Sequence, residues 1–403
     1  MTHSAATHLA QSAFTRTLFI PEPVKQELSH RLSEYLTEAA QAFPKLAGER
    51  ADLYLAGSLA RSEAAVEPAG SGYRLASDLD FVAVTQAPDE QPELVAQLLA
   101  HLRAFDDDFL PTCFVLGRSQ AARVRSHFGH DLWQGSRHPL VRGSSDGGPA
   151  RPAIGRQEML EVVVHQLANY LLVAPGPADE VTGRDRATPE HHLRKLQLEL
   201  LRAHAPVLGD DVPRYADLPA VSRTPPLDAL VSPEFVRELV RARELSQRNP
   251  EPATQGTQRV LRLLSALFIR TSPGVTDADG LAAALHAEGR TRHGVLWLFQ
   301  LCLIAYFTLT VSTGGAARRA ATTVLALWRR LDSAELREAR EMPDAVAALD
   351  PGEVTDPATP QAGLLHQAMT LLRLDYYHYL GPLNFGRIDY PGYSTPRGTG
   401  ARV

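Results

Sequence analysis

The sequence predicts an α+β fold: a small mixed β-sheet with flanking helices, followed by an all-α region. Two apolar runs, at residues 53–56 and 81–84, have the length and composition of short buried strands. A third apolar run, at residues 112–116, follows an amphipathic stretch. From Gln157 onwards, nearly every segment carries apolar residues at helical spacing, so the rest of the chain is expected to be helical.

The helices that flank the strands can be placed in order. Pro21 and Pro23 mark a helix start, and residues 24–43 have the apolar spacing of a helix that packs on the sheet behind the first strand. Residues 92–105 predict a second amphipathic helix. Beyond the sheet, helices are predicted at residues 157–173, 190–203, 258–270, 281–288, 316–337 and 362–380.

The domain organisation follows from the composition of the connecting segments. Residues 144–156 are rich in Gly, Pro and Ser, so we place the boundary between a first domain, 1–150, and a helical domain, 151–380, at this linker. Residues 381–403 are aromatic- and Gly-rich, and we expect a partly disordered tail. Residues 293–315 contain no charged side chain and are long enough to span a membrane, but a buried central helix is the preferred interpretation.

Composition limits the classes of partner. The chain has 403 residues and a formal net charge of −5, so it lacks the global basic field that attracts nucleic acid. Its only lysines are Lys25, Lys45 and Lys195, and an arginine-rich composition of this kind is typical of GC-rich bacterial genes. The two cysteines form no disulfide framework, and the N-terminus lacks the pattern of a signal peptide. We therefore expect a cytoplasmic protein that does not associate with membranes.

The chemistry of the chain is concentrated between residues 52 and 84. Asp78 and Asp80 precede and enter the second strand, and residues two apart on a strand point to the same face. Two converging carboxylates repel each other, and a hard divalent cation such as Mg²⁺ relieves that repulsion. Gly57 and Ser58 follow the first strand, where a tight turn and the first turn of a helix would place backbone N–H groups, the Ser58 hydroxyl and the Arg61 guanidinium around one anion. A phosphate site beside a metal site indicates phosphoryl or nucleotidyl transfer.

The pattern G-S-x-A-R-x-E at residues 57–63, followed by S-D-x-D at residues 77–80, resembles the signature of the DNA polymerase β-like nucleotidyltransferases. That superfamily includes aminoglycoside nucleotidyltransferases, CCA-adding enzymes and oligoadenylate synthetases. The turn-rich residues 67–74 lengthen the connection between the two halves and are compatible with a hairpin tip beside the site. The resemblance also implies that residues 136–143 form the short strand that closes the domain.

The resemblance implies a set of site residues. Asp78 and Asp80 would be catalytic and would hold two Mg²⁺ ions. The nucleotide-binding residues would be Gly57, Ser58, Arg61 and Ser77, with Lys195 from the helical domain. Helical domains of the superfamily often lend a lysine to the triphosphate, and a solvent-exposed surface lysine is the alternative for Lys195.

A third carboxylate usually lies on the strand after the second helix in this superfamily, but residues 111–117 contain no acid. Asp108, just before that run, is the predicted third catalytic acid. Asp131, Glu158 and Glu161 remain alternatives, and the acidic run that contains Asp108 would otherwise be a solvated turn.

The predicted activity is transfer of a nucleoside monophosphate from an NTP, most simply ATP, to a hydroxyl group, with release of pyrophosphate. The acidic net charge favours a small molecule or a protein as acceptor over an RNA end. Two alternatives stay open: a non-catalytic nucleotide-binding regulatory protein, and a nucleotide cyclase or oligonucleotide synthase that uses the same site.

Overall fold

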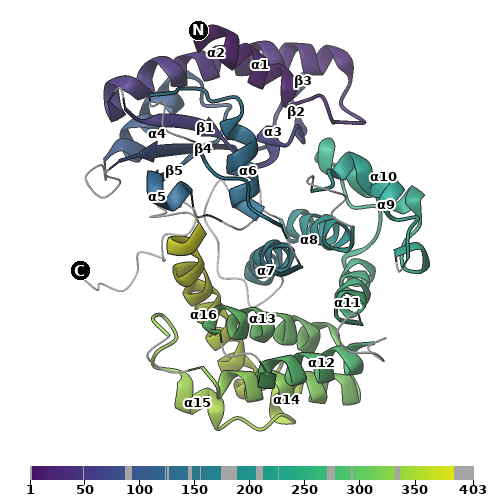
Figure 1. Cartoon of the computed structure of the whole chain (residues 1–403). Coiled ribbons are helices and arrows are strands. Elements are labelled where there is room, and N and C mark those ends of the chain that lie inside the picture. The colour runs from purple at the N-terminus through teal and green to yellow at the C-terminus, as the bar shows by residue number, and fades with distance from the viewer. Residues whose placement is uncertain are drawn as a thin grey trace.

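The structure, a computed structural model, is mixed α+β with a helical C-terminal region, which confirms the predicted class (Figure 1). It describes residues 2–48, 50–86, 93–122, 124, 127–143, 148–154, 156–173, 188–205, 212–225, 227–269, 277–291, 294–331 and 336–384. The remainder of the linker, residues 144–147 and 155, and residues 385–403 of the predicted tail lie outside this description.

The predicted sheet forms from the three apolar runs. Its strands are β1 (Asp52–Leu55), β4 (Leu79–Thr85) and β5 (Pro111–Gly117), in the order β1-β4-β5. Strands β1 and β4 are antiparallel, whereas β4 and β5 are parallel, so the sheet is mixed as expected. A separate hairpin consists of β2 (Val66–Ala69) and β3 (Gly72–Leu75), which matches the turn-rich insertion.

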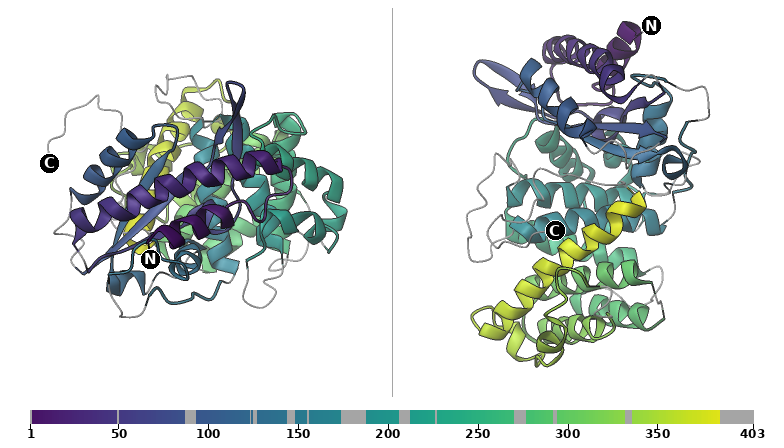
Figure 2. Two further views of the ribbon diagram at one scale, coloured as in Figure 1. Left: turned by 90° about the horizontal axis from the view of Figure 1, so that it is seen from above. Right: turned by 90° about the vertical axis from the view of Figure 1, so that its left-hand side faces the viewer.

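Helices cover both faces of the three-stranded sheet (Figure 2). On one face, apolar side chains of α1 (Thr2–Ser12), α2 (Glu22–Ala47) and α4 (Leu94–Phe105) share a core with alternate strand residues such as Phe81. On the other, α5 (Arg118–Ala121) and α6 (His127–Ser136) pack against Val82 and its neighbours. This alternation assigns the residues of β4 to opposite faces, as a strand requires.

The predicted closing strand at residues 136–143 is wrong as a strand. Helix α6 continues to Ser136, and Val141 alone forms a β-bridge, with Leu53 of β1. The two residues exchange hydrogen bonds of 2.9 and 3.1 Å between their backbone groups. Pro139 has no N–H with which to extend the pairing, so the contact stays limited to this bridge.

The helical region contains the predicted helices, but the helix predicted at residues 316–337 ends at Trp328. Its main helices are α7 (Arg156–Val173), α8 (Pro189–His204), α10 (Pro233–Glu244), α11 (Ala253–Ile269), α12 (Ala278–Thr291), α13 (Val295–Val311), α14 (Gly314–Trp328) and α16 (Pro360–Asn384). Two short helices, α9 (Leu218–Val221) and α15 (Pro343–Ala347), lie outside the helices predicted from the sequence. Helix α16 also includes the first residues of the predicted tail.

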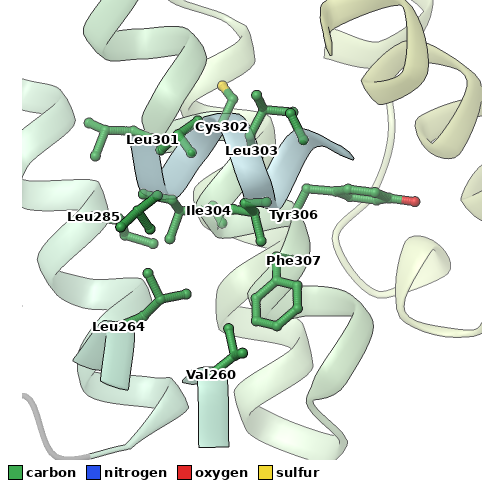
Figure 3. Close-up of a cluster of buried hydrophobic side chains, with 14 of the residues drawn as sticks. Val260, Leu264, Leu285, Leu301, Cys302, Leu303, Ile304, Tyr306 and Phe307 are labelled. Carbon is green, nitrogen blue, oxygen red and sulfur yellow. The ribbon is translucent and has the colours of Figure 1, made fainter. Parts of the chain in front are cut away.

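Helix α13 is the buried centre of this region. Its side chains from Trp297 to Leu309 are all buried. Figure 3 shows side chains of α13, including Ile304 and Phe307, gathered with Leu264 of α11 and Leu285 of α12. The apolar stretch is therefore a central core helix, as predicted, and none of the described helices has the length and apolarity needed to cross a membrane.

Two sets of apolar clusters lie on either side of the linker. Residues up to Leu140 build the clusters around the sheet, and residues from Leu160 onwards build the helical one. Leu245, at the end of α10, is the exception because it joins a cluster of the sheet. Helices α7 and α8 lie between the sheet and the C-terminal helices, so residues of α8 can meet residues of the sheet (Figure 1).

Candidate functional site

The Asp78 and Asp80 carboxylates lie at the start of β4. Leu79 and Phe81, which alternate with them, are fully buried in the cluster beneath α2 and α4. Asp78 is exposed and Asp80 is half-buried. The predicted alternation therefore holds: the apolar residues point into the core, and the acids belong to the opposite face.

The turn that follows β1 is built against Asp80. Gly57 begins the one-turn helix α3 (Gly57–Ala60) with φ +65°, a conformation that favours glycine. A Cβ atom added at this position would lie 2.0 Å from Oδ2 of Asp80. Glycine is thus required both by the backbone and by the carboxylate that it contacts. The Ser58 hydroxyl is half-buried and makes no hydrogen bond to any residue in the described part of the chain.

Thr112 of β5 holds the other oxygen of Asp80. The parallel register pairs Asp80 with Thr112, whose hydroxyl donates a 2.8 Å hydrogen bond to Oδ1. The resemblance placed the third carboxylate on this strand, and the register shows that a threonine occupies the position beside Asp80. The sequence analysis missed Thr112, because only the strand register identifies it as the neighbour of Asp80.

The electrostatics of Asp80 favour a bound cation. Burial and, next, the negative charge of Asp78 raise the pKa of Asp80 to about 6. The hydrogen bond from Thr112 and the positive charges of Lys195 and Arg61 lower that pKa in part. A cation between Asp78 and Asp80 would stabilise their ionised forms, because its charge offsets both the burial and the repulsion.

Lys195 reaches this site from α8. Its helix begins at the predicted Thr188-Pro189, where the Thr188 hydroxyl accepts a hydrogen bond from the backbone N–H of His191. Burial lowers the pKa of Lys195, while Asp78, Asp80 and Glu199 favour its charged form. Among the described residues, Lys195 forms no direct ion pair. Its ammonium group thus lies in the field of both aspartates without being neutralised by contact with either.

The placement of Asp108 does not support its predicted role as the third catalytic acid. Its carboxylate forms a 2.9 Å ion pair with Arg31 of α2, and its side chain is 46% exposed. Arg31 also stacks over the ring of Phe109, 5.5 Å from the centroid. The loop before β5 turns Asp108 towards α2, and α2 covers the face of the sheet opposite Asp80.

Other acids do not complete the pair in the described part of the chain. No group of three His, Cys, Asp or Glu side chains there could hold a metal ion. This leaves Glu158 and Glu161 of α7 outside any such group with Asp78 and Asp80. Asp131 of α6 is buried and paired with the Arg61 guanidinium instead.

Arg61 and Ser77, both predicted to bind the nucleotide, have structural roles here. Arg61 donates from Nε to Glu63 at 2.8 Å and from Nη1 to Asp131, so two of its three nitrogens are engaged by carboxylates. Ser77 is buried, and its hydroxyl accepts a 2.9 Å hydrogen bond from the backbone N–H of Ala65. Their role in nucleotide binding stays a prediction, and the charge of Arg61 acts on Asp80.

Glu63, the last residue of the G-S-x-A-R-x-E pattern, is the centre of a buried ion-pair network that joins the sheet region to α8. Its carboxylate accepts hydrogen bonds from Arg61, from Arg202 of α8 and from the backbone N–H of Tyr215. Neighbouring arginines lower the pKa of Glu63 to about 2, against the effect of burial. The sequence shows Glu63 and Arg61 as part of the pattern but gives no sign of Arg202 and Tyr215, because these two partners lie more than 130 residues away.

The donor set at Asp78 and Asp80 suits Mg²⁺. Magnesium prefers oxygen ligands, and proteins often bind it through one or two carboxylates together with substrate phosphates. Two carboxylates, one of which has a pKa raised by burial and by the other, meet that description. Comparison of the chain with models of protein families, with curated proteins and with solved structures finds no match. The family resemblance therefore rests on the residues of the site alone.

Proposed function

We propose that the protein is a nucleotidyltransferase that moves a nucleoside monophosphate from an NTP, with ATP the simplest choice, to a hydroxyl of a small molecule or protein. The observation that carries this proposal is the convergence of three parts of the chain. Asp78 and Asp80 lie at the start of β4, Gly57 and Ser58 form the turn after β1, and Lys195 comes from α8. Carboxylates for a metal, a turn for phosphate and a half-buried lysine together suit a metal-bound triphosphate.

The reaction exchanges one phosphorus–oxygen bond for another. The acceptor hydroxyl oxygen forms a bond to the α-phosphorus, the bond from that phosphorus to the bridging oxygen breaks, and pyrophosphate leaves. The hydroxyl proton passes to solvent or to a base. Magnesium bound by Asp78 and Asp80 would supply charge neutralisation at the phosphates.

The residues of the chain would prepare the substrate for this exchange. The Gly57–Ser58 turn offers the Ser58 hydroxyl to a phosphate oxygen, and the small glycine leaves Asp80 in contact with the turn. The Lys195 ammonium is a compact positive charge suited to the leaving pyrophosphate. Thr112 fixes the orientation of the Asp80 carboxylate through its hydrogen bond.

A specific observation favours a second candidate, a nucleotide-binding regulatory protein that does not release pyrophosphate. The strand expected to carry a third carboxylate has Thr112 beside Asp80, and Asp108 is held by Arg31. Binding of Mg²⁺–NTP needs only Asp78, Asp80 and Lys195, whereas activation of an acceptor hydroxyl also needs a base. The two candidates therefore share a ligand and differ in turnover.

An experiment with labelled nucleotide separates these candidates. The purified protein is incubated with each of the four NTPs, labelled on the α-phosphate, with Mg²⁺ and a small-molecule or protein fraction of a cell extract. Transfer of label to an acceptor with release of pyrophosphate supports the nucleotidyltransferase. Saturable binding without pyrophosphate release supports the regulatory protein. Label in a product formed from NTP alone identifies a cyclase or oligonucleotide synthase, and transfer of γ-label would indicate a kinase and refute the proposal.

A further inference from the structure

The turn that carries Gly57 and Ser58 is physically joined to α8 through Glu63. The backbone N–H of Glu63 donates a 2.8 Å hydrogen bond to the carbonyl of Ser58. Between them, Ser62 adopts φ +63°, a left-handed conformation that is uncommon for a residue other than glycine. A short, tightly turned segment thus connects the predicted phosphate turn to the Glu63 carboxylate.

The Glu63 carboxylate is bound to α8 and to the segment after it. Its Oε1 accepts from Arg202 Nη2 and, at 2.8 Å, from the backbone N–H of Tyr215. Arg202 also donates to Glu199 at 3.1 Å, and the Tyr215 hydroxyl donates to the same Glu199 oxygen. Glu63 and Arg202 are 2% and 1% exposed, so this connection is shielded from water.

Lys195 lies on the same face of α8 as the residues of this network. Lys195, Glu199 and Arg202 are spaced four and then three residues apart, which puts them in one row along the helix. Seven residues of α-helix span about 10 Å. Fixing Arg202 against Glu63 therefore fixes how far Lys195 stands from the turn and from the Asp78–Asp80 pair.

A further backbone connection completes the attachment. Arg243 of α10 donates from Nη1 to the carbonyl of Glu63 and, at 2.9 Å, to that of Ala64. The guanidinium carbon of Arg243 lies 5.2 Å from the centre of the Tyr215 ring. The guanidinium carbon of Arg202 lies 4.1 Å from the centre of the same ring. Both the side chain and the main chain of Glu63 are thus held by helices beyond the linker.

We propose that Glu63 and Arg202 are positioning residues, which set the distance between the phosphate turn and Lys195 so that one triphosphate can contact both. The identity of the ligand, a triphosphate, rests on the proposed function. The attachment of Glu63 to Arg202 does not depend on that function. The attachment predicts that loss of the Glu63 charge weakens triphosphate binding through Lys195. Metal binding at Asp78 and Asp80 should remain, because both lie at the start of β4 and neither belongs to this network.

The test compares Glu63→Gln with Glu244→Gln. Glu244 is a buried carboxylate that also joins the two regions, because it accepts hydrogen bonds from the N–H groups of Leu18 and Phe19. Among the described residues, it forms no hydrogen bond or ion pair with α8 or the turn. Affinity for a non-hydrolysable ATP analogue with Mg²⁺ is measured by calorimetry, and Mn²⁺ affinity by electron paramagnetic resonance. Glu63→Gln should weaken binding of the analogue by about ten- to a hundredfold, the range for loss of a residue that orients a binding residue without touching the bound group. The affinity for Mn²⁺ should stay unchanged. Glu244→Gln should change neither.

Combination with Lys195→Met isolates the positioning role. If Glu63 acts through Lys195, the effect of Glu63→Gln on analogue affinity should largely disappear in the Lys195→Met background. Additive effects would overturn the proposal, as would equal losses in Glu63→Gln and Glu244→Gln. If Glu63→Gln does not fold, Arg202→Lys keeps the charge, shortens the reach and should show the same selective loss.

Amide hydrogen exchange without nucleotide tests the attachment independently of the proposed function. Peptides that cover residues 57–63 and α8 should exchange faster in Glu63→Gln than in Glu244→Gln. Unchanged exchange in these peptides would refute the attachment. Failure of the wild-type protein to bind the analogue, with exchange behaving as expected, would refute the proposed ligand and leave the attachment in place.

Discussion

Two Asp-x-Asp segments precede neighbouring parallel strands of the same sheet, and they have different fates. Asp78 and Asp80 lead into β4, whereas Asp106 and Asp108 lie in the loop before β5. The second pair is bound by Arg31, which contacts Asp106 at 2.8 Å and Asp108 at 2.9 Å. At the first pair, the positive charge of Lys195 acts on both aspartates without a direct ion pair. The groups that contact Asp80 are uncharged.

The difference shows that spacing alone does not make a carboxylate pair into a site. Arg31 forms direct ion pairs with Asp106 and Asp108, so its positive charge compensates these carboxylates without a bound cation. Asp80 is oriented by the Thr112 hydroxyl and by the bare Cα of Gly57, neither of which carries charge. Asp80 is therefore held by uncharged groups, whereas Asp106 and Asp108 are paired with an arginine within the fold.

The strongest test of this comparison replaces one acid of each pair. Asp80→Asn should lower nucleotidyl transfer by about three orders of magnitude, because the metals lose a ligand that stabilises developing charge. Its thermal stability without metal should be unchanged or slightly higher, since repulsion from Asp78 is relieved. Asp108→Asn should keep its activity and lose at most about 1 kcal/mol of stability, as for an exposed ion pair. Equal activity losses in both variants, measured with α-labelled NTP, would erase the distinction.

A glycine pair tests whether the contact with Asp80 matters. Gly57 and Gly70 both have positive φ, so alanine at either position should cost about 1 to 2 kcal/mol of backbone strain. An added Cβ at Gly57 would collide with Asp80, whereas one at Gly70 would meet nothing within 4 Å. Gly57→Ala should therefore also lower activity by about a hundredfold, the effect of displacing a catalytic group by about 1 Å. Retained activity in Gly57→Ala, alongside a melting temperature like that of Gly70→Ala, would contradict the proposed contact.

Thr112→Val examines the orientation of Asp80 at nearly constant volume. The hydroxyl that donates to Oδ1 is lost, so the carboxylate should become less well ordered. We expect Mn²⁺ affinity to fall by about ten- to a hundredfold, as for other groups that orient a metal ligand. Electron paramagnetic resonance measures that affinity. An unchanged value would show that Gly57 and the strand suffice to hold Asp80.

The smallest expected effect concerns pH. Because the pKa of Asp80 is raised to about 6, the folded protein holds its proton more tightly than the unfolded chain. In metal-free protein this stabilising contribution is complete below about pH 4 and is lost as pH rises through 6. Mg²⁺ needs the ionised carboxylate, so the rise in melting temperature with Mg²⁺ should be full at pH 7.5 and fade below pH 6, by about tenfold in affinity per pH unit. Asp80→Asn should abolish this dependence, and a Mg²⁺ effect that persists at pH 5 would argue against binding at Asp80.

Local sequence patterns predicted much of the fold and part of the candidate site. The apolar runs at β1, β4 and β5 and the spacing of α2, α4 and α7 predicted these elements, because burial imposes a period of 2 or 3.6 that is visible in the chain. The alternation in β4 placed Asp78 and Asp80 on one face, and the glycine after β1 predicted a tight turn. The strand expected at residues 136–143 failed because that prediction came from resemblance, while Pro139 opposes regular pairing.

The sequence by itself determined the features that depend on neighbours along the chain. These are the buried strands, the amphipathic helices and the two acids at the start of one strand. Only the tertiary structure decided which charged group faces which. It joined Asp108 to Arg31, placed Lys195 in the field of Asp80, and connected Glu63 to Arg202. Periodicity records whether a side chain is buried, but the partner of a buried charge comes from a distant segment, and its selection by distance and desolvation leaves no pattern in the local sequence.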